Sequence, residues 1–366
     1  MEQKNAIYPK QRLSEPFIDQ MKKIQGILGF IVGIILSAVF GGCHSVDNWN
    51  NDYYGNFDAL WTIIDEHYCF LEYKDIDWVE TGKRYRSLID PEADEKEFFK
   101  VCSAMLDELK DGHTNLISWF DVSYYRKWWS DYPQDFDLRL IQEKYLGFDY
   151  LSSGGMIAKL MEEENVGYIY YSSFAAGFGE SFLDNAFLSM KDSDGLIIDI
   201  RDNGGGDLTN VEKLVGRFIN EKILAGYIQH KTGPGHNDFS EPYPFHYEPN
   251  LLHVRWLKPI VILSNRSTFS AANNFVSIMK QLPYVTVIGA TTGGGSGMPF
   301  SSELPNGWSV RFSGSPVFDS EKKLTEYGIA PDYPVTNDDY ETDTILETAI
   351  KYLNFLASEN KQEPQE

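Results

Sequence analysis

Basic side chains are scarce in this sequence. The 366-residue chain has 32 Lys and Arg against 54 Asp and Glu, which gives a formal net charge of −22. A surface of that sign repels nucleic acids and anionic lipid headgroups, so neither is expected as a partner. The apolar content of 42% still allows a substantial core, in one large domain or in two smaller ones.

Metal-ligand motifs are also missing. The chain has no H-E-x-x-H and no C-x-x-C motif, and its carboxylates are scattered, so no metal and no other cofactor is expected. Cysteine is rare, and two of the three cysteines, Cys69 and Cys102, lie in apolar, helix-like surroundings. Buried free thiols are the simpler prediction for both, and a disulfide between them stays open for an exported protein.

The apolar run near the amino terminus is short. Residues 27–40 follow Lys22 and Lys23 and are closed by Gly41-Gly42-Cys43. Spanning a bilayer takes about 20 apolar residues, so this run is too short to cross one comfortably. The pattern predicts a secretory signal peptide over residues 1–43, with either a long basic region or a true start at Met21.

Cys43 resembles the lipidated cysteine of a bacterial lipobox, although Phe40 occupies the usual Leu-like position. We therefore expect a lipid anchor through Cys43 and a location in the cell envelope, at the outer membrane or the periplasmic face. Residues 1–42 have five basic and three acidic side chains, a net of +2, so their removal changes the charge from −22 to −24.

Five segments follow the signal peptide. They are predicted as a polar tether (44–55), a helical N-terminal domain (56–118), a linking segment with short strands (119–165), a core (166–357) and a disordered tail (358–366). Apolar residues at helical spacing, such as Phe57, Leu60 and Ile64, support the helical domain. In the linking segment, short strands are plausible over 137–141 and 145–151.

Strands and helices alternate in the core segment. The continuous apolar runs 195–200 and 259–264 suit strands that are buried on both faces. Helical periodicity is expected over 180–190, 208–219 and 271–282. The alternation predicts an α/β fold with crossover connections.

The stretch from Asp199 to Leu208, DIRDNGGGDL, places three glycines after a buried strand. Without Cβ atoms, their backbone N–H groups can face outward and hold an anion or an oxyanion. The spacing is not that of a Rossmann fingerprint, because Thr209 stands at the last glycine position, and a P-loop would end in Gly-Lys-Ser/Thr. A tight strand–helix turn without a ligand is the alternative.

Ser270 stands between the strand-like run 260–263 and a helical stretch that begins at Ala271. One interpretation is a helix N-cap, although a capping box would have Glu or Gln where Asn273 stands. The other is a nucleophile, since the Ala271 N–H and the positive end of the helix could stabilise an oxyanion.

A nucleophilic serine needs a base and a group that orients the base. Of the seven histidines, His113 follows a glycine just after a predicted helix, where a loop can point into a cleft. Glu326 precedes Gly328 near a sharp turn, and it is one of 54 acidic residues. Taken singly, a structural histidine and an ordinary surface acid are the simpler interpretations.

Together these motifs, in this order, resemble the tricorn and C-terminal-processing serine peptidase family. The stretches that carry the resemblance are LKDGHTNL, VGYIYYSSF, DGLIIDIRDNGGG, VILSNRSTFSAANNF, VIGATTGGGSG and EYGIAPD. The resemblance covers most of the chain after the signal peptide. It implies a ClpP/crotonase-like β-α superhelix core behind a small helical domain.

The family has two catalytic layouts. The Ser–Lys dyad of processing peptidases is excluded, because Gly295 stands at the lysine position and no Lys lies between Lys280 and Lys322. The tricorn-type layout instead implies Ser270 as nucleophile, His113 as base and Glu326 as the carboxylate that holds the imidazole. The tricorn core also has a serine before the histidine, where this chain has Gly112, and an acid is common where Asn273 stands.

The resemblance further implies an oxyanion hole formed by the N–H groups of Ala271 and of Gly205 or Gly206. Residues 115–165 leave too little room for the PDZ module of processing peptidases. The implied function is an exported serine-type endopeptidase that cleaves peptide or protein substrates through an acyl-enzyme.

Two other functions stay open. A catalytically weak or inactive relative could bind a hydrophobic ligand or peptide, for which 22 Tyr and 23 Phe supply lining residues. A crotonase-like acyl-CoA enzyme would need basic residues for the CoA phosphates, and the acidic charge argues against it.

Overall fold

The structure is a computed structural model that describes residues 49–337 and 341–362. The predicted signal peptide, Cys43 and most of the tether lie outside these residues. No helix within them is long and apolar enough to cross a bilayer. Residues from Asn50 onward form one compact unit, and the description below concerns that unit.

Three helices open the unit: α2 (Tyr53–His67), α3 (Trp78–Arg86) and α4 (Glu95–Asp107). Each begins after an aspartate, Asp52, Asp77 or Asp94, whose carboxylate accepts a hydrogen bond from an N–H of the first turn. The helices expected in this segment are therefore present, and α2 starts within the segment predicted as tether. Cys69 and Cys102 are buried and free, which confirms the simpler prediction for both.

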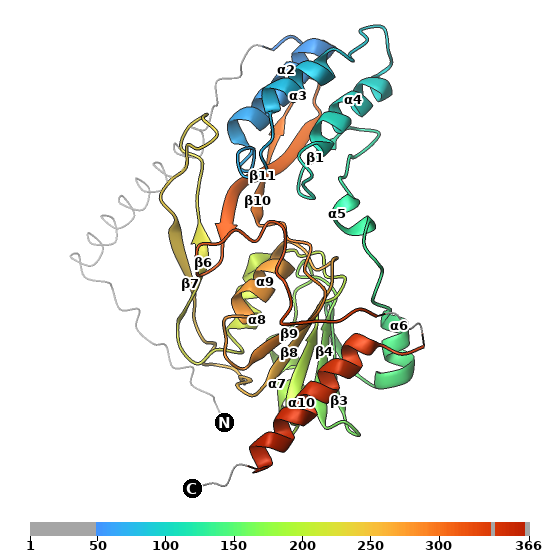
Figure 1. The fold of residues 1–366 in the computed structure, drawn as a ribbon, viewed down its shortest axis with the longest axis vertical. Helices are drawn as coiled ribbons and strands as arrows, with labels where there is room; N and C mark the ends of the chain where they lie inside the picture. The colour runs from blue at the N-terminus through green and yellow to red at the C-terminus, as the bar shows by residue number, and fades with distance from the viewer. Residues whose placement is uncertain (1–48, 338–340, 363–366) are drawn as a thin grey trace, which may run out of the picture. The chain divides into compact units, whose positions relative to one another are not determined.

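The helices do not form a domain from residues 56–118 alone. A hairpin from much later in the chain, β10 (Gly297–Glu303) and β11 (Ser309–Phe318), lies against them (Figure 1). Strand β11 pairs with β1 (Asn115–Ile117). Trp308 at the hairpin turn packs on Phe98 and Phe99 of α4, with ring centroids 5.6 and 5.4 Å apart. The N-terminal helices and the end of the core segment are thus one packing unit.

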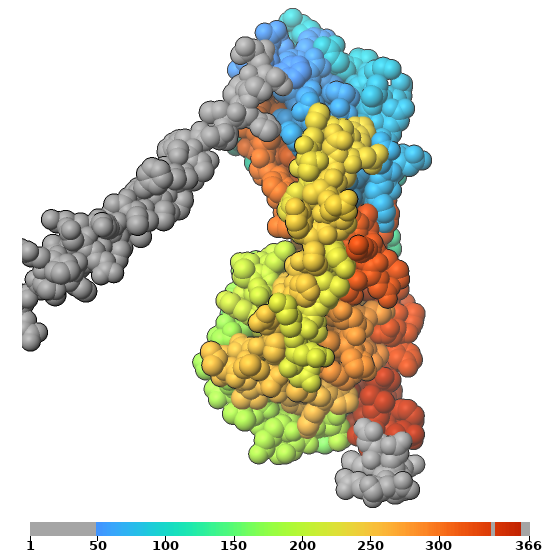
Figure 2. Space-filling model, turned by 90° about the vertical axis from the view of Figure 1, so that its left-hand side faces the viewer, coloured from blue at the N-terminus to red at the C-terminus, as the bar shows by residue number. Residues whose placement is uncertain are grey.

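A second hairpin completes this five-stranded sheet: β6 (Ile223–Ile228) pairs with β11 and with β7 (Tyr243–Tyr247). Its tip reaches α2 and the following turn, where His236 contacts Asp65 at 2.9 Å and Glu72 at 3.1 Å. Figure 2 shows the surface of this hairpin, in yellow, continuing from the core to the helices.

The linking segment differs from its prediction. Residues 138–141 form helix α6 (Leu138–Ile141), followed by a π-helical turn over Gln142–Leu146, where strands were expected. Asp137 caps α6 by accepting from two backbone N–H groups, and such a cap favours a helix over a strand. The segment also contains α5 (Lys127–Ser130), β2 (Leu151–Ser153) and β3 (Met156–Met161).

The core is a seven-stranded sheet in the order β12-β9-β8-β5-β4-β3-β2. Its four central strands are parallel and buried: β4 (Val166–Tyr171), β5 (Gly195–Asp199), β8 (Ile260–Ser264) and β9 (Val285–Gly289). The short β12 (Tyr333–Pro334) extends the parallel side, and β3 and β2 pair antiparallel. Apolar side chains cover both faces, as the continuous apolar runs predict.

Helices α7 (Glu180–Ser189), α8 (Leu208–Val215) and α9 (Ala271–Met279) share one apolar cluster with the sheet. Helix α10 (Thr344–Gln362) packs on the other face with the α6 region. The predicted α/β fold is confirmed. Helix α10 continues through Gln362, so the segment predicted as a disordered tail begins as helix.

The parallel strands direct the chain to one edge. After β5 comes the glycine stretch, after β8 comes Ser270, and after β9 come Gly293–Gly295. Open α/β sheets bind ligands at the carboxyl ends of their strands. Here that edge meets the N-terminal helices α2–α4 together with β1 and the β10–β11 hairpin, which we call the helical unit (Figure 1). The candidate site lies between this unit and the sheet.

Candidate active site

Ser270 stands at the turn between β8 and α9, with φ 57° and ψ −120°. Its side chain makes no capping hydrogen bond, so the N-cap interpretation does not account for it. A non-glycine residue in this conformation is strained by about 1–3 kcal/mol. The geometry is that of a nucleophile elbow, in which a sharp strand-to-helix turn exposes a serine oxygen.

The strained turn is held by neighbouring loops. The Ser270 N–H donates to Gly294 O at 2.8 Å, and the Ser270 carbonyl accepts from Asn274 N at 2.9 Å. Phe269 N donates to Asn203 O at 3.0 Å, which ties the turn to the glycine stretch. These bonds fix the direction of the Ser270 side chain toward the helical unit.

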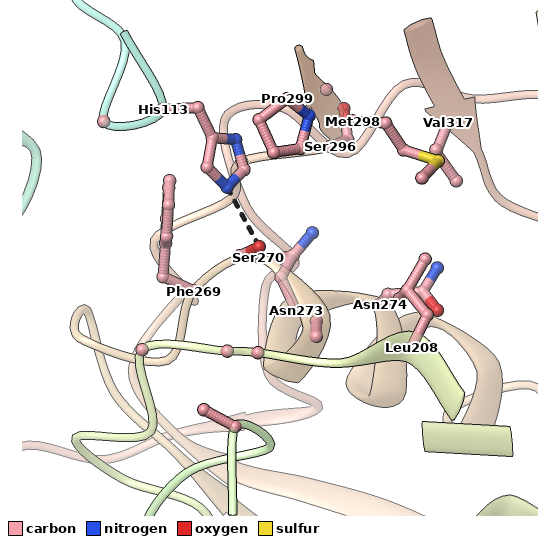
Figure 3. A pocket seen from close by; sticks show the side chains of 18 of the residues that line it. His113, Leu208, Phe269, Ser270, Asn273, Asn274, Ser296, Met298, Pro299 and Val317 are labelled. Atoms are coloured by element: carbon pink, nitrogen blue, oxygen red, sulfur yellow. Dashed lines mark hydrogen bonds between the residues drawn. The ribbon is translucent and has the colours of Figure 1, made fainter. Parts of the chain in front are cut away.

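His113 lies directly opposite. Its Nε2 is 2.9 Å from Ser270 Oγ although 157 positions separate the two residues, and Figure 3 shows this contact as a dashed line. The backbone N–H of His113 donates to Asp111 Oδ1 at 2.8 Å, and the backbone carbonyl of His113 accepts from Arg311 Nη1 at 3.2 Å. The sequence-predicted nucleophile and base are therefore within proton-transfer distance.

Burial sets the charge of this imidazole. His113 is 4% exposed, and desolvation lowers its pKa to about 4, although the nearby Asp111 carboxylate opposes the change. At neutral pH the imidazole is uncharged and has a lone pair for the Ser270 proton. For Nε2 to accept, Nδ1 must carry the hydrogen, and Nδ1 has no hydrogen-bond partner in the described part of the chain.

Glu326 does not make the predicted contact with the imidazole. Its Oε1 lies 2.8 Å from the Lys74 ammonium, and its Oε2 accepts from the Ser296 N–H at 2.9 Å. The carboxylate is buried next to a lysine that comes from the turn after α2, and the ion pair directs it there. The expectation that Glu326 holds the His113 ring directly is corrected.

Lys74 is the residue that the sequence reasoning missed. Its side chain is 4% exposed, and Nζ also donates to the carbonyls of Leu109 at 3.2 Å and Lys110 at 3.5 Å. It therefore joins the loop that carries His113 to the loop that carries Glu326. A weak signal was available, because Lys74 follows the buried aromatics Tyr68 and Phe70, whose rings lie 5.9 and 5.4 Å from its Nζ.

Lys74, Asp111 and Glu326 form a buried charge cluster beside His113. Burial alone would lower the pKa of Lys74, but the two carboxylates outweigh it and raise this pKa. Burial and then repulsion from Asp111 raise the pKa of Glu326. Burial also opposes ionisation of Asp111, yet Lys74 and His113 hold its pKa below the usual value. Asp111 therefore stays ionised. Its Oδ2 makes no hydrogen bond of standard geometry among the described residues, although the Ser313 and Tyr68 hydroxyls lie beside the carboxylate.

The glycine stretch supplies part of the predicted oxyanion hole. The Gly205 N–H already donates to Asn203 Oδ1 at 3.0 Å, so Gly205 is not a free donor and that assignment is corrected. The N–H groups of Gly206 and Ala271 have no hydrogen-bond partner among the described residues. A Cβ at Gly205 would lie 2.7 Å from Ser270 Cβ, and one at Gly206 would lie 1.9 Å from Ala175 N. Only glycine fits at either position.

A serine at Gly112, as in the tricorn core, would require the neighbouring aromatic side chains to move. A Cβ there would lie 2.5 Å from Trp128 Nε1 and 2.9 Å from Phe269 Cζ. Trp128 stacks on Phe269 with ring centroids 4.1 Å apart and fills this side of the site. In this structure the aromatic pair occupies the space of the fourth network member.

Asn273 occupies a position where the family commonly has an acid, and its side chain links α9 to two loops. Its Oδ1 accepts from Thr292 Oγ1 at 2.7 Å, and its Nδ2 donates to Thr325 Oγ1 at 3.1 Å. The amide thus ties α9 to the loops before Gly293 and Glu326. An amide does this better than a carboxylate, because it both donates and accepts.

A pocket of about 760 Å³ opens at the Ser270–His113 pair. The core contributes the glycine stretch and the Ser270 turn, and the helical unit contributes His113, Asn115 and Arg311. Met298 and Pro299 of β10 complete the upper wall in Figure 3. The pocket is wide enough for several residues of an extended peptide.

Comparisons with known proteins agree with this arrangement. The family model described as Peptidase family S41 matches residues 165–335, and the model described as Tricorn protease C1 domain matches residues 50–107. A solved structure of a "putative peptidase" from Parabacteroides merdae is 49% identical to this chain, with a TM-score of 0.79. That match covers 83% of this chain and 97% of the other.

Two curated proteins are more distant. The carboxy-terminal processing protease CtpB of Bacillus subtilis is 27% identical over 137 residues, which is 37% of this chain and 26% of CtpB. A protein of Sulfurisphaera tokodaii named as a Tricorn-like protease C-terminal subunit is 27% identical over 233 residues, 58% of this chain and 24% of that protein. These matches span about a quarter of the length of either relative.

Proposed function

Because the chain belongs to peptidase family S41, a family of serine-type peptidases, we propose that it is an exported endopeptidase that cleaves peptide bonds through an acyl-enzyme on Ser270. The observation that carries the proposal is the 2.9 Å contact between Ser270 Oγ and His113 Nε2 at a strained turn. A neutral, buried imidazole at this distance is a suitable general base.

In the first step Ser270 Oγ attacks the carbonyl carbon of the scissile bond, and His113 Nε2 takes the hydroxyl proton. The negative charge that develops on the carbonyl oxygen is met by the N–H groups of Gly206 and Ala271. Removal of one such donor typically slows a reaction by about 10²–10³-fold. The C–N bond then breaks, and His113 returns the proton to the leaving amine.

In the second step a water molecule attacks the ester carbonyl. His113 takes the water proton and returns it to Ser270 Oγ as the acid product leaves. Both steps pass through a protonated imidazole. This cation would form next to Asp111, which is ionised, so the cluster can stabilise it.

In this mechanism Glu326 acts through the cluster and not by contact with the ring. Its ion pair with Lys74 joins the His113 loop to the core, and its bond from Ser296 N holds the neighbouring loop. Glu326 is therefore a positioning residue in the proposed mechanism. The proposed location, a lipid anchor through Cys43 in the cell envelope, rests on the sequence pattern of residues 1–43.

A fluorophosphonate probe and a peptide substrate test the proposal together. The wild-type protein should be labelled at Ser270 and should hydrolyse the peptide, and Ser270→Ala should do neither. His113→Ala should lose peptide hydrolysis. Equal hydrolysis by wild type and His113→Ala would contradict the assigned base. A folded wild-type sample that neither reacts with the probe nor cleaves peptides would instead support a ligand-binding function.

A further inference from the structure

Arg311 is a half-buried cation that has no ion pair with a carboxylate of the described chain. It lies in β11 opposite Asn115, and its half-buried side chain lines the pocket that contains Ser270 and His113. Among the described residues that line this pocket it is the only Lys or Arg. Arg126, Arg255 and Arg266 also have no ion pair with a carboxylate of the described chain, but none of them lines this pocket.

The two fully buried arginines differ from Arg311 in their partners. Arg201 pairs with Asp199 and Asp343, and Arg217 pairs with Glu180 and Asp184. No carboxylate of the described chain lies within ion-pair distance of Arg311. Arg311 donates from Nη1 alone, to His113 O at 3.2 Å and to Asn115 Oδ1 at 3.4 Å. Its Nε and Nη2 have no hydrogen-bond partner among the described residues.

Burial without a close anion is unfavourable for a guanidinium. Desolvation lowers the pKa of Arg311, and only the more distant Asp111 and Tyr124 oppose this. Arginine stays charged nonetheless, and its planar fork fits a carboxylate with two parallel hydrogen bonds. A ligand that brings a carboxylate would therefore gain a strong, partly desolvated interaction at this wall.

The position of Arg311 indicates which part of a substrate it meets. His113 protonates the leaving amine, so the substrate segment that follows the scissile bond lies on the imidazole side of Ser270. Arg311 is bonded to the backbone of His113 itself. The oxyanion donors, Gly206 and Ala271, come from the other wall, on the core.

We propose that Arg311 binds a substrate carboxylate on the leaving-group side of the scissile bond. The inference rests on the proposed peptidase function and names the class of peptide that the site prefers. The carboxylate has two sources, an acidic side chain just after the scissile bond or the free carboxyl terminus of a short leaving fragment. Their chemistry at Arg311 is the same.

The test uses a peptide that the full-length protein cleaves, identified by mass spectrometry of a digested denatured protein. Matched versions replace an acidic residue after the scissile bond with its amide, or the free carboxyl terminus with a carboxamide. Wild type should prefer at least one carboxylate form by about 10- to 100-fold in kcat/KM, since a hydrogen bond to a charged group is worth that much. The pair that shows the preference identifies the source.

Variants of Arg311 should change the ratio between the matched peptides. In Arg311→Met the preference should fall to about onefold, and in Arg311→Glu a lysine at the same substrate position should become favoured. Arg311→Gln keeps a donor for the His113 carbonyl, so it should fold even if the Met variant does not. It lacks the positive charge, so it should also lose the preference for a carboxylate. Arg255→Met is the matched control, because Arg255 also donates to a backbone carbonyl, that of Ile219, but does not line the pocket.

The outcomes separate the two proposals. Cleavage by wild type with no preference for a carboxylate, or an unchanged preference in both Arg311→Met and Arg311→Gln, would overturn this inference and leave the peptidase intact. Absence of both cleavage and fluorophosphonate labelling would overturn the proposed function itself.

Discussion

Two regions of this protein bury one cation with two carboxylates, and they do so in different ways. At the edge of the core sheet, Arg201 is fully buried and its guanidinium donates to Asp199 and to Asp343 at 2.6–3.0 Å. At the candidate site, Lys74 contacts Glu326 at 2.8 Å, with Asp111 beside them. In the first cluster both carboxylates form an ion pair with the cation, whereas in the second only Glu326 does.

The difference separates a structural cluster from a functional one. In the Arg201 cluster each carboxylate places both of its oxygens on the guanidinium, and this planar contact favours a single arrangement. The Lys74 cluster has the same two carboxylates and one cation, but the ammonium is paired with Glu326, whose pKa is raised to about 7 by burial, and a titratable ring lies next to Asp111. This second arrangement can accept one more positive charge, and the imidazolium that forms during proton transfer is such a charge.

The largest effect is expected in the Arg201 cluster. Arg201→Met would leave Asp199 and Asp343 buried with no counter-charge, and loss of one partner of a buried pair costs about 3–5 kcal/mol. Urea unfolding should show this loss in the free energy of unfolding. The folded fraction of the variant should lose activity at low pH at the same point as wild type. This fall of kcat/KM, the acid limb of the pH–rate profile, reports protonation of His113. A loss below about 1 kcal/mol would mean that these buried ion pairs contribute little to the free energy of unfolding.

Lys74→Met should lower the stability of the protein and raise the pKa of His113. It removes the counter-charge of Glu326 and the link between the His113 loop and the core, so the free energy of unfolding should fall by about 3 kcal/mol. Lys74 also lowers the pKa of His113, so its removal should move the acid limb of kcat/KM to higher pH. Lys74→Arg should retain the limb near its wild-type position. A limb that stays fixed in Lys74→Met would show that the lysine acts only as a structural tie.

Stability against pH should show the burial of His113. Its folded pKa of about 4 is below the ordinary value of 6.5, so the unfolded chain binds the proton more readily. The stability contributed by the neutral ring is present above pH 6.5 and is lost as pH falls through 4, by up to about 3 kcal/mol. The difference between wild type and His113→Gln in urea unfolding at pH 7 and pH 4 isolates this contribution. Parallel curves for the two proteins would contradict a buried neutral imidazole.

The core of this fold was largely predictable, because its strands are continuous apolar runs and its helices have clear periodicity. Ser270 and His113 were assigned through the family resemblance, because each motif taken singly also fitted a helix cap or a structural histidine. Pairings between distant segments were not predictable. The hairpin formed by β10 and β11 looks like core sequence but joins the N-terminal helices, and Lys74 meets Glu326 across more than half of the chain.

The same limit explains the error on Glu326. Its place in the sequence matched the family layout, but the direction of a carboxylate depends on which cation is nearest after folding. Short elements such as α6 were also missed, because a four-residue segment has too few positions to show a period.

The smallest expected effect is also the most specific. In Asp111→Asn the side-chain oxygen can still accept from the His113 N–H, so the loop should keep its conformation while the charge beside the imidazole is lost. The imidazolium would lose a neighbouring anion, and kcat should fall by about 10- to 100-fold. Because Asp111 raises the pKa of His113, the acid limb of kcat/KM should move to lower pH, opposite to the change in Lys74→Met. Arg311 and Lys74 both lower the pKa of His113, and both are unchanged in this variant.

Asp343→Asn is the matched control in the Arg201 cluster, where the same substitution should reduce stability and leave the acid limb in place. If both substitutions moved the limb alike, the functional difference between the two clusters would be refuted.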